Sequence, residues 1–555
     1  MSHKRLLRTI VYLIVVLTLL VSADGFVLAK PGDGEEKLEM YTVTVTHGQA
    51  QKLAREGYDI AASRPAPGGV ELDLVLSGTE FAQLRGQGLQ LGLKRNRDGK
   101  TATELAAEQA AAGFTVWRSY DEPGGIRDEL YQIAHDNPQN VKLNVIGHTF
   151  EGREIIALKV THGAGSPDGS QPAVLYSSAQ HAREWISVEV NRRLLHYFVD
   201  NYGQDPEVTD LVDNRELWFV LVANPDGYQY TFDVDRLWRK NLQDNDGDGM
   251  ITNLDGVDPN RNFDEHWNYD EEGSSSLFSS ETFRGANAAS ELETQAMQGL
   301  LDGLPFKFMV NYHSYGQLLL YSFGWQVQTP SADNPIFLAL SGTDNNPAIP
   351  GFDPGVGADL YITNGETTDY AHARANTLAW TPELSEGIPG NGFVFPDDET
   401  LIQQEFLNVL DFSLDVAKSA ANPAQPVSHL GNTVEPFYIE MSSIEPELSG
   451  NPLGDFRFAV SYGDPQIVQV LAARSLGDVT LKYQVNNGAV QSAPTTEWDG
   501  GERFGGPGDV YYHIVRGQVT GTQPGNTVKV WFEGGGQVSD FFEYTAQIES
   551  NAQVL

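Results

Sequence analysis

Alternating apolar and polar positions mark the first folded part of the chain, between about residues 30 and 100. The stretches "MYTVTVTHG" and "VELDLVLSG" alternate in the way typical of half-buried strands. The stretches "QAQKLAREG" and "TEFAQLRGQG" have helical spacing and end at glycine. These patterns predict a small α+β module over residues 30–100.

Strands and helices alternate from about residue 114 to residue 420. The runs "AVLYSSA", "ELWFVLVAN" and "FKFMVNYHS" are nearly continuous in apolar residues, as expected for strands buried on both faces of a sheet. Between the first two runs, Ile186, Val190 and Leu194 recur at steps of four, which predicts a helix. The pattern indicates an α/β domain with a mixed, twisted sheet flanked by helices and with active groups at strand ends.

The chain becomes rich in strand patterns again after "AANPAQPVSH". The stretch "DVTLKYQVNNGAVQSA" predicts a hairpin that turns at Asn486, Asn487 and Gly488, and "NTVKVWFEGGGQVSDFFEYTA" continues the alternation. Residues 421–555 are therefore predicted to form a β-sandwich domain, and no catalytic candidate falls in them.

A secretion signal is predicted at the N-terminus. Basic residues at positions 4, 5 and 8 precede an apolar run from Ile10 to Val21, and small residues follow it. This run is shorter than a membrane span requires, although an uncleaved anchor is the alternative. We expect residues 1–29 to be a signal peptide and the protein to be secreted and extracellular, with no stable membrane anchor after cleavage.

A basic stretch, "KRNRDGK", and an Ala-rich stretch follow the N-terminal module. An exposed basic segment before a flexible one is a site where an activating protease would cut. The alternative is an ordinary linker between domains. Residues 101–115 are predicted to be this linker.

Composition limits the partners and the sources of stability. The formal net charge of the 555 residues is -39, and such an acidic surface repels phosphate backbones, so nucleic acid is not an expected partner. The chain has no cysteine, so disulfides are excluded and the fold must rest on packing and metals.

His181 and Glu184, in "SSAQHAREW", are the first candidate metal ligands. They are three residues apart at the start of a predicted helix and can converge on one ion, but such a pair is common by chance. His313 ends a buried apolar run in "FMVNYHSYGQLLLYSFG", where a strand would deliver it to the edge of the sheet. Two histidines and a glutamate are one of the ligand sets of catalytic zinc.

Seven segments in a fixed order carry a resemblance to a known family. They are "VIGHTFEGREIIALKV", "SSAQHAREW", "NPDGYQYT", "RLWRKN", "GVDPNRNF", "NYHSYGQLLLYSFG" and "WTPELSEG". With them, residues 116–420 resemble the zinc carboxypeptidases of the carboxypeptidase A/B type. The resemblance implies an eight-stranded mixed sheet and one catalytic Zn²⁺ held by His181, Glu184 and His313. In the family a module before the catalytic domain often covers the active site of a zymogen until it is cleaved. The N-terminal module is propeptide-like in this sense, and it could inhibit, assist folding or persist in the mature enzyme.

The resemblance also implies roles for other residues. Glu383 matches the carboxylate that takes a proton from the attacking water and passes it to the leaving amine. Arg239 matches the group that stabilises the oxyanion. Three further residues match the binding site for the free C-terminal carboxylate of a peptide or protein, and one matches a partner of His181; they are Asn260, Arg261, the mobile Tyr361 and Asp258.

Specificity follows from the residues that match the pocket for the last side chain. These are Leu320, Gly324, Thr363, Glu366 and Thr368. Relatives strict for basic residues carry an aspartate where this chain has Thr368, and those strict for apolar residues carry an isoleucine. We therefore expect a broad or dual preference that includes basic residues, which Glu366 would attract.

The loop "DNDGDGMITNLD" fits part of a calcium-loop template. Asp244, Asp246 and Asp248 stand at positions 1, 3 and 5, Gly249 at 6 and Asp255 at 12. The last ligand of the template is normally a glutamate, so a solvated acidic loop is the alternative. The loop is a candidate Ca²⁺ site between Arg239 and the carboxylate clamp.

Two other functions remain open on sequence alone. The chain could cut an unusual substrate such as a peptidoglycan stem peptide, or it could be a catalytically inactive protein that binds peptide ends or surfaces. Retention of Glu383 and Arg239 favours an enzyme, because binding alone needs no base.

Overall fold

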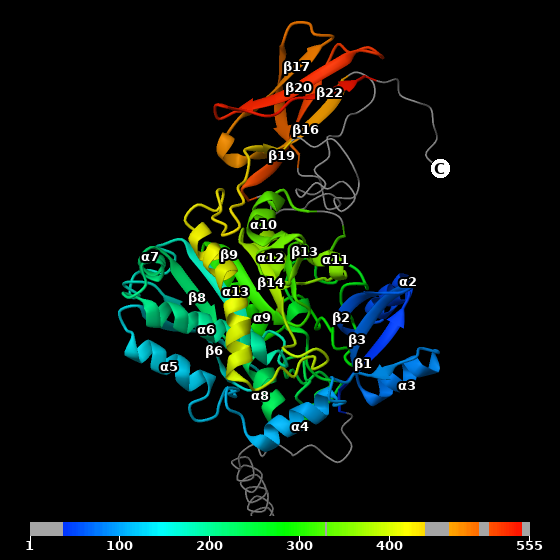
Figure 1. The fold of residues 1–555 in the computed structure, drawn as a ribbon, viewed down its shortest axis with the longest axis vertical. Helices are drawn as coiled ribbons and strands as arrows, with labels where there is room; N and C mark the ends of the chain where they lie inside the picture. Colours follow the sequence, from blue (N-terminus) through cyan, green and yellow to red (C-terminus); the bar gives the residue numbers. More distant parts are fainter. Residues whose placement is uncertain (1–36, 328–329, 439–464, 499–509, 547–555) are drawn as a thin grey trace, which may run out of the picture.

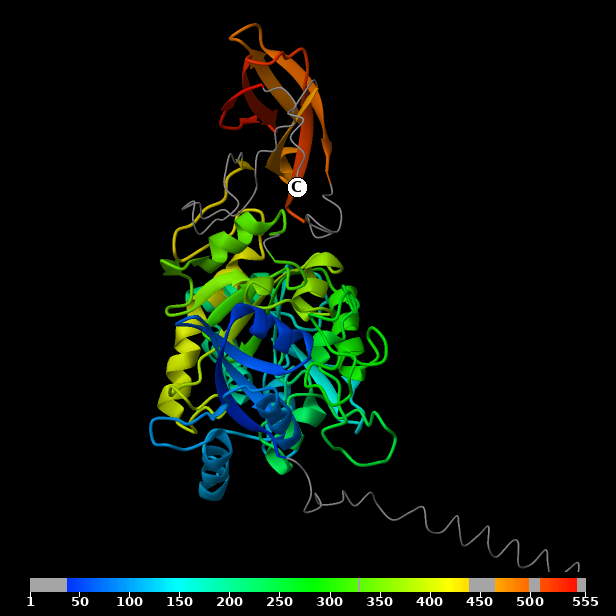
Figure 2. The same ribbon diagram turned by 90° about the vertical axis from the view of Figure 1, so that its right-hand side faces the viewer.

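The computed structural model describes residues 37–327, 330–438, 465–498 and 510–546. They form a small N-terminal module, a large central domain and a β domain at one end of the central domain (Figures 1 and 2). The predicted signal peptide lies outside the described residues. None of the helices described is long and apolar enough to cross a membrane.

A four-stranded antiparallel sheet with two helices forms the N-terminal module, as the sequence predicts. Its elements are β1 (Glu39–Val45), α2 (His47–Arg55), β2 (Asp59–Ala66), β3 (Gly69–Leu76), α3 (Gly78–Gly86) and β4 (Gly92–Leu93). The strand order is β2-β3-β1-β4. Both helices begin with a capping box, and their buried residues Leu53 and Leu84 pack on the apolar faces of β1 and β3.

The predicted linker contains a helix. Residues 102–112, which the sequence analysis assigns to a flexible linker, form α4 (Ala102–Ala112), with a capping box made by Thr101 and Glu104. Alanine has the highest helix propensity, so an Ala-rich stretch with a good N-cap favours a helix over flexible chain.

The basic segment before this helix is only partly exposed, contrary to the prediction. Lys94 is buried, and its Nζ donates to Asp73 Oδ2 at 2.7 Å, Tyr315 Oη at 3.1 Å and Glu386 Oε2 at 3.2 Å. A buried ammonium needs such partners. The exposed basic positions are Arg95 and Arg97, which follow it.

An eight-stranded mixed sheet forms the middle of the central domain, in the order β13-β10-β14-β9-β7-β8-β6-β5. The strands are β5 (Val141–His148), β6 (Glu154–Val160), β7 (Ala173–Ser178), β8 (Glu216–Val220), β9 (Phe306–Ser314), β10 (Leu318–Tyr321), β13 (Asp353–Val356) and β14 (Leu378–Leu384). The central strands β8, β7, β9 and β14 are parallel to one another. Their carboxyl ends therefore meet at one edge of the sheet, where ligands bind in open α/β sheets.

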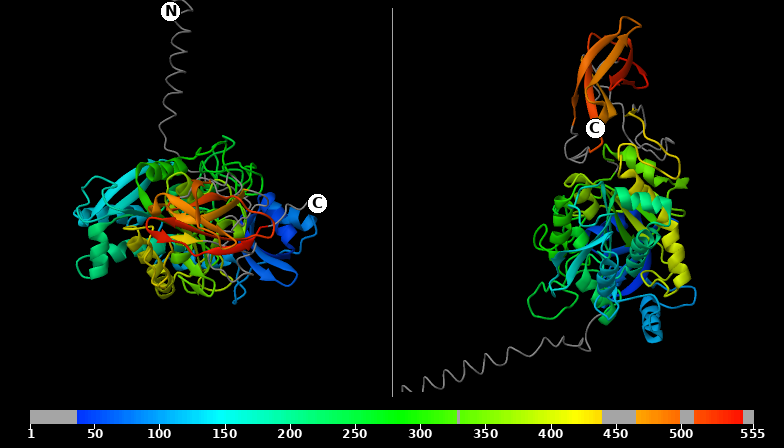
Figure 3. Two further views of the ribbon diagram at one scale, coloured as in Figure 1. Left: turned by 90° about the horizontal axis from the view of Figure 1, so that it is seen from above. Right: turned by 90° about the vertical axis from the view of Figure 1, so that its left-hand side faces the viewer.

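Helices cover both faces of this sheet (Figures 1 and 3). One face packs against α5 (Ile126–Asp136), α6 (Trp185–Asn201), α7 (Pro206–Asn214), α10 (Asn334–Ser341) and α13 (Glu399–Ser419). The other face packs against α9 (Leu292–Gly303) and α12 (Thr367–Ala373). The remaining short elements are α8 (Pro225–Asp233), η1 (Pro259–Arg261), β11 (Gly342–Thr343), β12 (Asn346–Pro347) and α11 (Gly357–Leu360). The predicted mixed sheet flanked by helices is confirmed.

The β domain is antiparallel throughout. Its strands are β15 (Phe437–Tyr438), β16 (Gln466–Ala473), β17 (Val479–Val485), β18 (Gln491–Glu497), β19 (Tyr512–Val519), β20 (Thr527–Gly534), β21 (Gln537–Val538) and β22 (Phe542–Thr545), with the short helix η2 (Arg474–Leu476). Strand β18 pairs with both β17 and β19, so the two halves of the predicted sandwich belong to one bent sheet. The predicted hairpin turn is present: Asn486 and Asn487 have φ of 49° and 57°.

Candidate active site

Three predicted metal ligands meet at the carboxyl edge of the central sheet. His181 follows the end of β7, Glu184 is the N-cap residue of α6, and His313 lies near the end of β9. Because β7 and β9 are parallel neighbours, both strands deliver their following residues to the same edge. All three side chains are buried.

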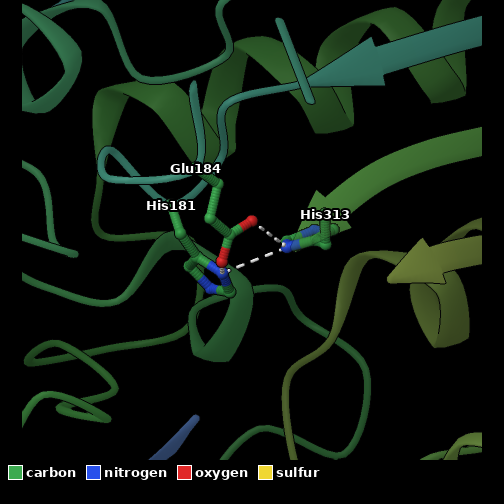
Figure 4. Close-up of side chains that lie close together, drawn as sticks. All are labelled: His181, Glu184 and His313. Atoms are coloured by element: carbon green, nitrogen blue, oxygen red, sulfur yellow. Dashed lines mark hydrogen bonds and ion pairs between the residues drawn. The ribbon is translucent and has the colours of Figure 1, made fainter. Parts of the chain in front are cut away.

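The three side chains point toward one another (Figure 4). Nδ1 of His181 lies 2.9 Å from Glu184 Oε1, and Nδ1 of His313 lies 3.0 Å from Glu184 Oε2. The two Nδ1 atoms are 3.0 Å apart. Two imidazole nitrogens and a carboxylate oxygen therefore converge on one point.

The donor set and its geometry fit zinc. Tetrahedral ligand atoms about 2.05 Å from the ion lie ~3.4 Å from each other, close to the separations in this cluster. Burial and the positive charge of Arg239 lower the pKa of His181, so its ring is neutral at pH 7. Burial alone would raise the pKa of Glu184, but the two imidazoles hold it well below the usual range. Burial alone would lower the pKa of His313, but the Glu184 carboxylate raises it. A metal ion bound here would take the place of the proton on that ring.

Both histidines have partners on the ring nitrogen that faces away from the cluster. Nε2 of His181 lies 3.1 Å from Asp258 Oδ1, as the predicted role of Asp258 requires. Nε2 of His313 lies 2.9 Å from the side-chain amide of Asn311, on the same strand. Such contacts fix the orientation of a metal-binding ring.

Glu383, the predicted base, lies beside this cluster on β14. It is the register partner of His313 across the parallel β9–β14 pair, and it lines the same cavity. Burial raises its pKa to about 7, against the opposing effect of His313. A bound dication would draw this pKa down again, which favours the ionised form that a base needs.

Arg239 is fixed by Asp258. Its Nε and Nη2 donate to Asp258 Oδ2 at 3.1 and 2.8 Å, and both side chains are buried. Asp258 therefore joins His181 and Arg239 in one network and holds the arginine at the cavity wall. This contact leaves Nη1 of Arg239 for a substrate oxygen.

The predicted carboxylate clamp lies on η1, directly after Asp258. Oδ1 of Asn260 accepts hydrogen bonds from the backbone N–H of Thr367 at 2.9 Å and from its hydroxyl at 2.8 Å. The guanidinium of Arg261 is 2% exposed and donates through Nη1 to the backbone oxygen of Asn260. Among the described residues, Nε of Arg261 has no hydrogen-bond partner. A buried and underused guanidinium at a cavity is suited to an anionic ligand.

A cavity of about 150 Å³ connects these groups. Its lining includes His181, Glu184, the predicted base and the clamp, together with Arg239 and Tyr361. His313 lies directly behind this wall, in contact with His181 and Glu184. The N-terminal module closes one side of the cavity, because residues 60–64 of β2 are part of the lining. Asp59, next to them, forms a bidentate ion pair of 2.6 and 3.0 Å with Arg183 of the central domain.

The structure separates the five predicted specificity residues into two groups. Leu320, Thr363 and Glu366 line the cavity, whereas Thr368 and Gly324 are not among its lining residues. The Thr363 hydroxyl donates to Glu366 Oε2 at 2.9 Å. A Cβ at Gly324 would lie 2.3 Å from the same oxygen, so only glycine leaves room for the Glu366 carboxylate in this position.

The candidate calcium loop brings three of its four aspartates together. Ligand atoms of Asp244, Asp246 and Asp255 lie within 4.8 Å of one another, and Asp248 is not in this group. Asp255 is fully buried and accepts from the N–H groups of Asn245 and Thr252. Between α8 and η1 the described chain has no helix, so the loop lacks the flanking helices of an EF-hand.

The sequence analysis missed three residues at this site. They are Asn311, Asp369 and Arg183, which contact His313, Gly324 and Asp59 respectively. Each is polar and lies within two residues of a quoted motif residue, but a polar residue beside a motif has no distinctive spacing. The contact that each residue makes became visible only in the structure.

Comparison with known proteins gives a consistent result. A family model described as "Zinc carboxypeptidase" matches residues 126–406. Carboxypeptidase A4 of Mus musculus is 32% identical over 297 residues, which cover 52% of this chain and 68% of that protein. Carboxypeptidase B of Homo sapiens is 32% identical over 290 residues, which cover 51% of this chain and 67% of that protein.

A solved structure supports the same conclusion. Carboxypeptidase A from Helicoverpa armigera has a TM-score of 0.57 and 25% identity, and the match covers 70% of this chain and 98% of that one. The predicted resemblance to carboxypeptidases A and B is thus confirmed, and the His-Glu-His cluster of the family's zinc chemistry is present. The chain belongs to the zinc carboxypeptidase family of hydrolases.

Proposed function

We propose that this protein is a secreted zinc carboxypeptidase that hydrolyses the C-terminal peptide bond of peptides and proteins. The observation that carries the proposal is one cavity lined by His181, Glu184, Glu383 and Arg261, with His313 completing the group of candidate metal ligands beside it. A metal-binding group of side chains and a nearby base are suited to the hydrolysis of an amide bond. The buried guanidinium of Arg261 beside them restricts the reaction to chain ends, because only a free C-terminus supplies the matching carboxylate.

Each side chain has one task in this reaction. Arg261 and Nδ2 of Asn260 bind the terminal carboxylate, and Arg239 donates to the oxygen of the scissile carbonyl. A zinc ion held by His181, Glu184 and His313 would supply positive charge and a bound water whose pKa is about 7. Glu383 takes a proton from the attacking water and gives it to the leaving nitrogen as the C–N bond breaks. Tyr361 closes the cavity over the bound terminus.

A matched pair of peptides tests this proposal. One has a free C-terminus and the other carries the same sequence with a C-terminal amide. We expect the kcat/KM of the amide to be lower by at least about 100-fold, since one charge-assisted pair is worth ~3 kcal/mol. Equal cleavage of the two peptides would show that the enzyme does not recognise a chain end.

The specificity proposed for this enzyme is broad or dual and includes basic C-terminal residues. Its support is Glu366, a carboxylate that lines the cavity next to Thr363. Replacement by glutamine keeps the shape and removes the charge. Glu366→Gln should lower the ratio of arginine release to leucine release by about 10-fold, and an unchanged ratio would contradict the proposal.

The N-terminal module is proposed to be an inhibitory propeptide. Residues 60–64 of β2 stand in the cavity wall, where a substrate would enter, and the Asp59–Arg183 ion pair fastens the strand there. Cleavage by an activating protease would fall at exposed Arg95 or Arg97, beyond the buried Lys94. Loss of inhibition on trypsin cleavage, with a new N-terminus at this segment, would support the proposal. Full activity of the uncleaved chain would contradict it.

A structural Ca²⁺ is proposed for the loop of Asp244, Asp246 and Asp255. The loop lies in the chain between Arg239 and the clamp residues Asn260 and Arg261, so an ion there would hold both parts of the site. A calcium-selective chelator, with zinc retained, should lower the melting temperature and the activity. Unchanged values of both would leave the loop as a solvated acidic turn.

A further inference from the structure

Asp333 connects the central domain to the β domain. It is the N-cap residue of α10, at the end of the central domain that faces the β domain (Figures 1 and 3), yet its side chain makes no capping hydrogen bond. The buried carboxylate instead accepts from the backbone N–H groups of Val510, Tyr511 and Tyr512, at 2.6, 2.7 and 2.9 Å. Tyr512 is the first residue of β19 and the other two residues precede it, so Asp333 binds the start of a strand from the other domain.

The same carboxylate holds a buried histidine. Nε2 of His372 lies 3.1 Å from Asp333 Oδ2, and both side chains are completely buried. Nδ1 of His372 has no hydrogen-bond partner among the described residues. Nε2 is the donor, because the carboxylate oxygen it faces accepts, so Asp333 receives four hydrogen bonds, which is about the full capacity of a carboxylate. A buried network in which the acceptor is fully used is strongly ordered.

His372 is in turn packed against residues 322–324, which lie behind the specificity pocket: the backbone oxygen of Gly324 accepts from the N–H of the cavity-lining Thr363 at 2.8 Å. Its ring stacks on Phe323, with centroids 5.0 Å apart and planes at 12°. The residues on either side of Phe323 bond to α12: the Ser322 hydroxyl donates to the Thr368 carbonyl at 3.1 Å, and the Gly324 N–H donates to Asp369 at 3.0 Å. Segment 322–324 is thus held to α12 at three successive residues.

The N-terminal end of α12 is part of the substrate site. Its N-cap residue is Glu366, which lines the cavity, and Thr367 bonds to Asn260 of the carboxylate clamp. His372 stands in the last turn of the same seven-residue helix. A shift of this helix at His372 would therefore move the pocket wall and the support of the clamp.

We propose that Asp333 and His372 are positioning residues through which the docked β domain holds α12 and residues 322–324 in the shape of the specificity pocket. This inference rests on the proposed carboxypeptidase function. It assigns the β domain a part in substrate selection, although none of its described residues lines the cavity. The effect belongs to the selectivity for the last side chain, because the hydrogen bonds of Asp333 go to His372 and to residues 510–512, and not to the elements that carry the zinc ligands and Glu383.

The test compares full-length variants on peptides that end in arginine, phenylalanine or alanine. Asp333→Asn removes the charge and places an N–H₂ group among N–H donors, and His372→Phe keeps the stacked ring but removes the donor. Each should lower the kcat/KM for the arginine and phenylalanine peptides about 10-fold relative to the alanine peptide, mainly through KM. Asp344→Asn, an exposed carboxylate after α10, is the matched control and should change nothing.

Two further measurements separate positioning from a general loss of stability. The double variant Asp333→Asn/His372→Phe should lose no more selectivity than either single variant, because both act through one contact. His372→Gln should recover part of the selectivity lost in His372→Phe, since its amide restores the donor. If Asp333→Asn does not fold, the selectivity among the three peptides is compared between the wild type and the two His372 variants alone.

The outcomes distinguish this inference from the proposed function. A wild-type chain that shortens none of the peptides would overturn the carboxypeptidase proposal itself. An active wild type whose variants keep the same selectivity, or lose activity equally on all three peptides, would overturn the positioning role alone.

Discussion

The ion pair between Asp59 and Arg183 offers a direct test of how the N-terminal module is held on the active site. The pair is bidentate, and the two residues are 3% and 0% exposed. The change we consider is Asp59→Asn in the full-length chain. It alters the module alone, so the enzyme released by cleavage is identical to that released from the wild type.

The magnitude follows from burial. Removing one partner of a buried ion pair costs about 3–5 kcal/mol, because the remaining charge has no compensation. Asparagine still accepts one hydrogen bond from Arg183, so we take ~3 kcal/mol. At 1.4 kcal/mol per factor of ten, the ratio of open to closed module should rise about 100-fold.

The assay is the kcat/KM of the uncleaved chain, divided by that of the same preparation after the module has been removed. This ratio should rise about 100-fold in Asp59→Asn, or to its maximum of one. Glu56→Gln, an exposed carboxylate of the same module, is the control and should leave the ratio unchanged. Thermal unfolding measured in parallel reports whether the module remains folded.

An unchanged ratio in a folded Asp59→Asn chain would refute this reasoning. It would mean that other contacts hold the module without the ion pair, such as the apolar cluster that Ala62 shares with Tyr315 and Phe393, and the bonds of Lys94 to the central domain. A ratio near one in the wild type would show that the module does not inhibit at all.

Three other predictions concern single residues. Burial raises the pKa of Glu281 to about 7. The folded chain then holds this proton more tightly than the unfolded chain. The free energy of unfolding therefore falls as pH rises from 4.5 to 7, by at most about 3 kcal/mol. In Glu281→Gln the free energy of unfolding, measured by urea titration, should differ less between pH 5 and pH 8 than it does in the wild type. An equal difference in the two proteins would contradict this prediction. Gly324→Ala should raise the KM for large C-terminal residues about 10-fold by displacing Glu366, whereas an unchanged KM would refute the predicted contact. Asn311→Ala should weaken zinc binding about 10-fold in competition with a chelating dye, and unchanged affinity would argue against its role at His313.

The sequence identified the parts of the site that lie on strands and in motifs. His181 and His313 each end an apolar run, and parallel strands bring such ends to one edge, so their convergence could be predicted. The hairpin at Asn486 and Asn487 was equally predictable, because its turn needs residues that accept positive φ.

Contacts between distant elements were not predictable. Lys94 reads as an exposed basic residue, and its burial depends on Asp73, Tyr315 and Glu386, which come from two domains. Nothing in the sequence around Asp333 indicates its role, and only the docked strand shows why its side chain turns away from its own helix. Local patterns specify elements, whereas these polar contacts depend on how the elements pack.

A time course of peptide shortening, followed by mass spectrometry, tests the central claim most directly. The module-free wild type, the zinc-chelated wild type and Glu383→Gln are compared on peptides with different C-terminal residues. We predict stepwise loss of single residues from the C-terminus of the free peptides, abolished by chelation, restored by added zinc and lowered at least about 1,000-fold in Glu383→Gln. Internal cleavage, or shortening that survives both chelation and the Glu383 change, would contradict the proposed site and its chemistry.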